Sequence, residues 1–145
     1  MKAKLNDFKI NIMARSVNEG FLRTVVAAFS ALADPTIEEI NDIKTAVSEA
    51  VTNSIVHGYR EKQGRIYIDA VLFSDNTVKI KIRDKGCGIE DVKKAMEPLY
   101  TTAGDERSGL GFSVMESFTD KLSVRSTPGK GTVVTLTKKI TGKCE

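Results

Sequence analysis

Residues 78–88, which read Val-Lys-Ile-Lys-Ile-Arg-Asp-Lys-Gly-Cys-Gly, join an alternating segment to a glycine-rich turn. Apolar and basic residues alternate over the first six positions, which predicts a β-strand with one buried face. Asp84 ends that strand, and Gly86 and Gly88 allow backbone conformations that other residues disfavour. The Asp84 carboxylate could accept a hydrogen bond from the exocyclic amine of adenine, where guanine would present an oxygen. On residue preferences alone, an ordinary tight turn explains the same pattern.

A second signal lies upstream, in a long amphipathic segment. Thr36 and Glu39 form the capping-box pattern of a helix N-terminus. Apolar and small residues then recur at helical spacing as far as about Gly58: Ile40, Ile43, Val47, Ala50, Val51 and Ser54. At about 100° per residue, Glu49 and Asn53 project about 40° apart and roughly opposite to that stripe. We therefore expect these two side chains to share a helix face outside the core.

The chemistry of this pair suits phosphoryl transfer. A glutamate with an ordinary pKa is ionised at neutral pH, so Glu49 could act as a catalytic base toward an attacking hydroxyl. The amide oxygen of Asn53 suits Mg²⁺, a hard cation that takes its other ligands from phosphates and water. Taken alone, a glutamate and an asparagine on an exposed helix face are more often solvated surface residues. Their significance depends on the other motifs.

Two further glycine pairs follow the Asp84 turn. Gly109 and Gly111 open a predicted helix, whose first N–H groups could bind phosphate. Gly129-Lys130-Gly131-Thr132 indicates a hairpin turn, and the Thr132 hydroxyl could add a contact near the base. A polar segment before Gly109 predicts a lid that closes over a triphosphate, with four groups able to reach it: Thr101, Thr102, Arg107 and Ser108. No glycine-rich segment ends in Gly-Lys-Ser/Thr, so the other common phosphate-binding loop is excluded.

The order of elements predicts an α/β protein, a two-layer sandwich with a mixed sheet of about five strands and helices on one face. Ser16 and Glu19 predict a capping box for a first helix that ends at Asp34-Pro35. The expected strands cover about 8–12, 66–72, 78–82, 121–126 and 132–137, and short helices are expected at 90–97 and 111–118. The length of 145 residues fits a single ATP-binding domain spanning 1–145.

Composition restricts the classes of partner. The chain has 22 Lys+Arg against 19 Asp+Glu, and the positive residues are scattered along the sequence, so we expect no direct nucleic-acid partner. Cys87 and Cys144 lie in unlike contexts and do not indicate a disulfide framework, which favours a reducing cytoplasm. No secretion signal and no apolar run of about 20 residues is present, so no membrane anchor is expected.

The motifs together resemble a known superfamily. Ser48-Glu49-Ala50-Val51-Thr52-Asn53, Asp84-x-Gly86-x-Gly88, Gly109-x-Gly111 and Gly129-x-Gly131-Thr132 are similar, in this order, to the nucleotide-binding boxes of the gyrase/histidine-kinase/MutL ATPases. The resemblance is closer to the small anti-sigma serine kinases of spore-forming bacteria and spans nearly the whole chain. One departure is Ala103-Gly104, where the lid of that family often has a Lys-Pro pair.

The resemblance implies a homodimer that binds ATP and Mg²⁺, captures and inhibits a sporulation sigma factor of the sigma-F type, and phosphorylates a serine of an anti-anti-sigma factor. It implies that Glu49 is the catalytic base, that Asn53 is the Mg²⁺ ligand and that Asp84 reads adenine. Arg23 aligns with an arginine that contacts both protein partners in this family.

Three alternatives remain open. A general-stress anti-sigma kinase of the same family would show the same motifs. A histidine-kinase catalytic domain or freestanding ATPase is disfavoured, because the single histidine, His57, lies in the Glu49–Asn53 helix and closes it rather than accepting phosphate. A binding protein with an inactive pocket is weakened by the presence of both Glu49 and Asn53.

Overall fold

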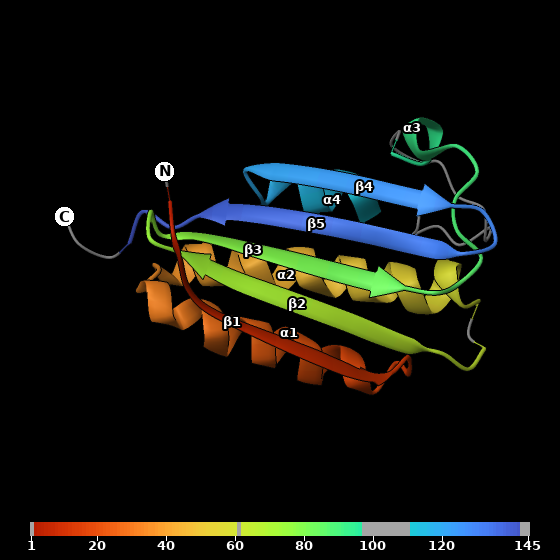
Figure 1. Cartoon of the computed structure of the whole chain (residues 1–145), viewed down its shortest axis with the longest axis horizontal. Coiled ribbons are helices and arrows are strands. Elements are labelled where there is room, and N and C mark those ends of the chain that lie inside the picture. Colours follow the sequence, from red (N-terminus) through yellow and green to blue (C-terminus); the bar gives the residue numbers. More distant parts are fainter. Residues whose placement is uncertain (1, 61, 97–110, 143–145) are drawn as a thin grey trace.

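The computed structural model of the chain describes residues 2–60, 62–96 and 111–142. It has two layers, a five-stranded sheet and a layer of helices packed on one of its faces, as expected for an α/β sandwich (Figure 1). The elements are, in chain order, β1 (Lys4–Met13), α1 (Asn18–Ser30), a 3₁₀ turn η1 (Ala31–Ala33), α2 (Ile37–Asn53), a π-helical turn η2 (Ser54–Gly58), β2 (Arg65–Phe73), β3 (Thr77–Asp84), α3 (Val92–Ala95), α4 (Gly111–Ser117), β4 (Lys121–Thr127) and β5 (Gly131–Lys139).

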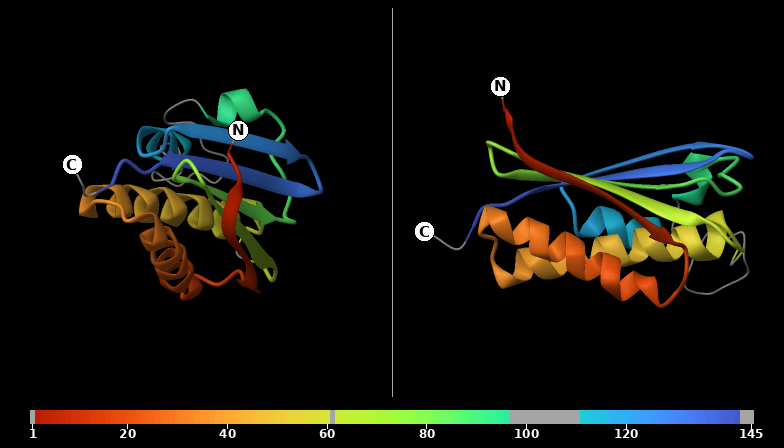
Figure 2. Two further views of the ribbon diagram at one scale, coloured as in Figure 1. Left: turned by 60° about the vertical axis from the view of Figure 1, so that its left-hand side comes forward. Right: turned by 60° about the horizontal axis from the view of Figure 1, so that its bottom comes forward.

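The sheet is antiparallel throughout, which corrects the expectation of a mixed sheet. Its order is β1-β2-β3-β5-β4, and each neighbouring pair runs antiparallel. The reason is the even number of helices between β1 and β2: α1 leads the chain away and α2 brings it back to the end where β1 finished (Figure 2). Strand β2 therefore begins beside the end of β1, where the Ala14 N–H donates to the Gly64 carbonyl at 2.8 Å.

Helix α2 begins as predicted. The Glu39 N–H donates to Thr36 Oγ1 at 3.0 Å and the Thr36 N–H donates to Glu39 Oε1 at 2.9 Å, so the capping box is complete. The buried side of the helix follows the predicted stripe, although Ile40 is only half-buried. Glu49 and Asn53 are half-buried on another side. The long helix thus holds both candidate site residues in a defined orientation.

The predicted capping box of the first helix is wrong. Helix α1 has Val17 at its N-cap and no side-chain cap there. The Glu19 carboxylate instead accepts the hydroxyl of Ser48 from α2, and it lies 3.6 Å from the guanidinium of Arg23. The Glu19 side chain, which the local pattern assigned to the helix cap, therefore forms a contact between two helices instead.

The interior is formed by the inward faces of the strands and the facing sides of the helices. The largest fully buried side chains include Leu22 of α1, Ile43 of α2 and Ile80 and Ile82 of β3. The turn predicted between β2 and β3 is confirmed, with Asn76 at φ 68°. The short helix expected at 90–97 is confirmed over Val92–Ala95, capped by Asp91. None of the helices in the described part of the chain has the length and apolar character needed to cross a membrane.

Candidate functional site

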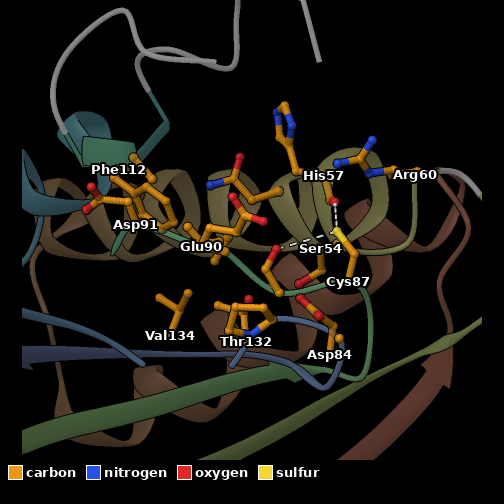
Figure 3. A pocket seen from close by; sticks show the side chains of 18 residues that line it. Ser54, His57, Arg60, Asp84, Cys87, Glu90, Asp91, Phe112, Thr132 and Val134 are labelled. Atoms are coloured by element: carbon orange, nitrogen blue, oxygen red, sulfur yellow. Dashed lines mark hydrogen bonds between the residues drawn. The ribbon is translucent and has the colours of Figure 1, made fainter. Parts of the chain in front are cut away.

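A cavity of about 430 Å³ lies at one end of the sheet, which is within the usual size of ligand pockets (Figure 3). Because the strands run antiparallel, four termini lie at this end of the sheet: the last residues of α2 and β3 and the first residues of β5 and α4. Four of the predicted site residues line the cavity, Asn53, Asp84, Gly88 and Thr132, and Gly129 of the last glycine motif lines it as well. The motifs that were separate in the sequence therefore share one site.

Asp84 is a buried carboxylate on the cavity wall, only 5% exposed. Burial raises the pKa of Asp84, and hydrogen bonds from the Gly86 N–H, the Ser54 hydroxyl and the Thr132 N–H oppose that rise. The bond from the Gly86 N–H to Oδ1 measures 2.9 Å. A carboxylate in this setting can accept one more hydrogen bond from an amine that enters the cavity.

Glycine is required where the Asp84 turn meets the end of α2. A Cβ at Gly86 would lie 2.1 Å from the carbonyl oxygen of Gly58, and a Cβ at Gly58 would lie 2.8 Å from Asp84 Oδ2. The two backbones are held together by the Cys87 N–H, which donates to the Gly58 carbonyl at 2.8 Å. Gly88 has φ +78°, a conformation that favours glycine. The close approach leaves the carboxylate beside bare backbone, where a flat ring can lie.

Thr132 connects the cavity to the two strands beside it. Thr132 lies on β5, where it pairs with Asp84 of β3 on one side and with Ser126 of β4 on the other. Its hydroxyl lies 2.8 Å from the hydroxyl of Ser126. Ser126 Oγ also accepts the N–H of Ile89 at 2.7 Å. The hydroxyl of Thr132 thus helps to fix the 84–89 turn as well as lining the cavity. Ser126 was not predicted, because only the register of β4 against β5 reveals it.

Asn53 lies against the beginning of α4. A Cβ at Gly111 would lie 3.0 Å from Asn53 Oδ1, so a larger residue there would require the Asn53 amide to shift by a few tenths of an ångström. Glu49 lies one helical turn earlier and is half-buried, but it is not among the residues that line the cavity. Asn53 therefore lines the cavity, whereas Glu49 lies one helical turn away and outside its lining.

Several lining residues were not predicted as site residues. Cys87 lines the cavity and its Sγ donates to the His57 carbonyl at 3.2 Å (Figure 3). His57 belongs to the π-helical turn that closes α2, as expected, and it also lines the cavity. Such turns are frequent at functional sites, but a sequence pattern does not show them. Glu90 and Phe112 also line the cavity, close to the Gly88 and Gly111 motif positions, although neither was predicted as a site residue.

Other predicted residues lie elsewhere. Thr101, Thr102, Arg107, Ser108 and Gly109 lie outside the described residues, as does the Ala103-Gly104 departure, and their roles stay predictions. Arg23 lies on α1, away from the cavity lining, with its side chain 40% exposed. The proposed contact of Arg23 with a protein partner stays a prediction, and the exposure of the side chain is compatible with it.

The residues present fit a nucleotide with Mg²⁺. The cavity offers a buried acceptor, a bare backbone surface and an amide oxygen, which match a base and a metal-bound phosphate chain. Within the described residues, no group of three or more His, Cys, Asp or Glu forms a metal site by itself. Asn53 would therefore supply one ligand and the nucleotide and water the others.

Comparisons with known proteins agree with the presence of a nucleotide-sized cavity, because they match an ATPase domain. A family model for the histidine kinase-like ATPase domain matches residues 13–138. An anti-sigma F factor from Thermoanaerobacter sp. (strain X514) is 59% identical over 136 residues, covering 93% of this chain and 94% of that protein. An anti-sigma F factor from Clostridium acetobutylicum is 53% identical over 135 residues, covering 92% of this chain and 94% of that protein.

Two solved structures share the fold at low identity. The RsbU and RsbW domains of a Mycobacterium tuberculosis protein match with a TM-score of 0.68 and 22% identity, over 93% of this chain and 32% of that one. The mycobacterial sensor histidine kinase MprB matches with a TM-score of 0.60 and 13% identity, over 94% of this chain and 100% of that one. This chain therefore belongs to the histidine kinase-like ATPase domain family, in the group of the anti-sigma F factors.

Proposed function

We propose that this protein is an anti-sigma factor and an ATP-dependent protein serine kinase that acts as a single domain. It captures and inhibits a sporulation sigma factor of the sigma-F type and phosphorylates a serine of an anti-anti-sigma factor, as a homodimer in the cytoplasm. The observation that carries the proposal is the 59% identity to an anti-sigma F factor, which extends over 94% of that relative. The cavity supports the nucleotide part of the proposal independently.

The three residues to which we assign roles in phosphoryl transfer all lie in the described part of the chain. Asp84 accepts a hydrogen bond from the amine of adenine, because its buried carboxylate borders the cavity. Asn53 contributes an amide oxygen to Mg²⁺, which when bound neutralises charge on the phosphates and orients them for transfer. Glu49 takes the proton of the attacking serine hydroxyl. These roles require no separate phosphoacceptor within the chain.

The position of Glu49 suits a substrate that comes from another protein. Four residues of α-helix correspond to a rise of about 6 Å, so Glu49 lies about one turn from the proposed metal ligand. It is half-buried and lies beside the cavity rather than in its wall. A base for a partner's serine must be reachable from outside while ATP occupies the cavity, and this placement supports that requirement.

A transfer assay with matched variants tests the proposal. The protein is incubated with γ-labelled ATP, Mg²⁺ and a candidate anti-anti-sigma factor, and label on each chain is followed over time. Glu49→Gln is expected to keep ATP binding but to slow transfer by about 100-fold or more. Glu38→Gln is the control, because Glu38 lies on the same helix and is exposed; its transfer rate should not change.

The outcomes separate the function from the residue assignment. Absence of label on the partner with the unchanged protein would reject the serine kinase. Normal transfer by Glu49→Gln would remove Glu49 from the mechanism while leaving the kinase in place. Capture of the sigma factor is measured separately, by pull-down with and without ATP.

A further inference from the structure

Within the described part of the chain, no helix covers the face of the sheet opposite α1 and α2 (Figure 2). Alternation along β3 directs Ile80 and Ile82 into the core, so the residues between them point outward. The outward positions of β3 and β4 carry five basic side chains: Lys79, Lys81, Arg83, Lys121 and Arg125. Positive residues that are scattered in the sequence are therefore gathered on one surface.

The register arranges these cations in two rows. Lys79 and Lys121 both pair with Thr137 of β5, and Arg83 and Arg125 both pair with Val133. Because β5 lies between β3 and β4, the rows are two strand spacings apart, about 10 Å. The floor between them is formed by Val133, Thr135 and Thr137, beside Ser123 of β4. A hollow of about 690 Å³ covers this region, and we call it the β5 groove.

The three strands that form the floor and sides of the groove contribute no carboxylate to it. The outward residues of β3, β4 and β5, all of them described, include no Asp or Glu. Asp69 of β2 also lines the hollow, but its Oδ2 lies 3.7 Å from the Lys9 ammonium. The ring of Tyr67 at the groove's edge is faced by Arg83 at 4.5 Å and Lys85 at 4.9 Å. The local charge is strongly positive although the whole chain has a net charge of only +3.

Apart from Tyr67 at its edge, the groove has no exposed large apolar or aromatic side chain among the described residues. The core of a protein–protein interface is enriched in aromatic residues, Met and Arg and depleted of Lys, whereas three of the five cations here are lysines. The exposed large apolar residues in the described chain all lie outside β3, β4 and β5: Leu5, Met13, Val17, Phe21, Leu32, Ile37 and Phe118. Nucleic-acid interfaces, in contrast, are polar and much more positively charged. The chemistry of the groove favours a polyanion.

We propose that the β5 groove binds the phosphodiester backbone of a single-stranded nucleic acid. The two rows of cations flank the strand, and the hydroxyls of Ser123, Thr135 and Thr137 donate hydrogen bonds to phosphate oxygens. An extended single strand fits between rows about 10 Å apart, whereas a duplex is too wide to reach the floor. This proposal departs from the expectation of no direct nucleic-acid partner, and it is independent of the proposed kinase activity.

Fluorescence anisotropy with a labelled oligonucleotide of about 16 nucleotides tests the groove. Excess Mg-ATP is present so that the nucleotide cavity cannot account for binding. If all five cations contact phosphate, the affinity should fall about 100-fold between about 50 and 200 mM salt. The double variant K81E/R125E, at two exposed positions, should bind at least about 10-fold more weakly and with a smaller salt dependence.

The control variant is Lys62→Glu, which changes an exposed lysine before β2, outside the groove. It should bind the oligonucleotide as the unchanged protein does, and all variants should keep their circular dichroism and ATP affinity. Three results would overturn the proposal: no binding at low salt, equal binding by the double variant, or tighter binding of a duplex. Preferential binding of polyglutamate or of phosphatidylserine vesicles would assign the groove to an acidic protein or a membrane instead.

Discussion

Replacing Glu39 with glutamine is expected to destabilise the fold and to remove part of its sensitivity to acid. Glu39 is 9% exposed and joins the beginning of α2 to the segment after β5. Its Oε2 accepts the N–H of Thr141 at 2.8 Å and the hydroxyl of Thr141 at 2.7 Å. Its Oε1 accepts the N–H of Thr36 at 2.9 Å and that of Gly142 at 3.3 Å. Burial alone would raise the pKa of Glu39, but these hydrogen bonds outweigh it.

The magnitude follows from the pKa. The hydrogen bonds lower the pKa of Glu39 from 4.5 to about 2. At about 1.4 kcal/mol for each unit of pKa, the difference between 4.5 and about 2 corresponds to about 3.5 kcal/mol of stability from the ionised form. Because the folded pKa lies below the unfolded one, this stability is complete above about pH 4.5 and is lost as the pH falls toward 2. Glutamine cannot accept all four bonds, since its amide nitrogen is a donor.

Urea unfolding at pH 7 and pH 3 measures the effect. At pH 7, Glu39→Gln should lower the free energy of unfolding by about 2–3 kcal/mol. At pH 3 the difference between the variant and the unchanged protein should be smaller. Glu38→Gln is the matched control, because Glu38 is the exposed neighbour in the same helical turn. An equal destabilisation at both pH values would refute the role of the ionised carboxylate.

Three further predictions concern the site and its partners. Asp84→Asn should weaken ATP binding by about 10-fold or more, because the amide would present a donor to the Gly86 N–H; an unchanged affinity in calorimetry would exclude Asp84 from recognition of adenine. Gly58→Ala should also weaken ATP binding, since its Cβ would lie 2.8 Å from the Asp84 carboxylate, whereas Gly20→Ala, with 3.5 Å of space, should not. Arg23→Glu should weaken sigma-factor capture in a pull-down without changing ATP affinity, and normal capture would reject that contact.

The local sequence pattern correctly predicted the capping box of α2 but not that of α1. The reason lies in the partners of the two glutamates. The Thr36/Glu39 box forms because both side chains lie at the helix end and Glu39 still has oxygens left for Thr141. The Ser16/Glu19 pair has the same spacing, but the Glu19 carboxylate accepts Ser48 from α2. A sequence window cannot weigh a partner that arrives from another helix. A capping box therefore fails where a group from another helix binds the acidic side chain in place of the local backbone N–H.

The candidate site was predictable from the sequence at positions where the local backbone itself requires a particular residue type. Asp84 ends a strand, and Gly86 and Gly88 are required by close approach and by positive φ, so their pattern is visible in sequence. Ser126 became visible only through pairing, because β4 must lie in register with β5 before it meets Thr132. Long-range register decides such contacts, and no local signal reports it.

The same register explains why the basic surface was missed and why it can be tested separately from the cavity. Successive residues of β3 point to opposite faces, so Ile82 packs in the core while Lys81 and Arg83 face outward. Counting charge along the chain averages over both faces and gives only +3. Substitutions of Lys81 therefore act on the open face, whereas those of Asp84, three residues later, act on the cavity. Loss of ATP binding in the K81E/R125E variant would contradict this separation, because the sheet lies between the groove and the helices that complete the cavity.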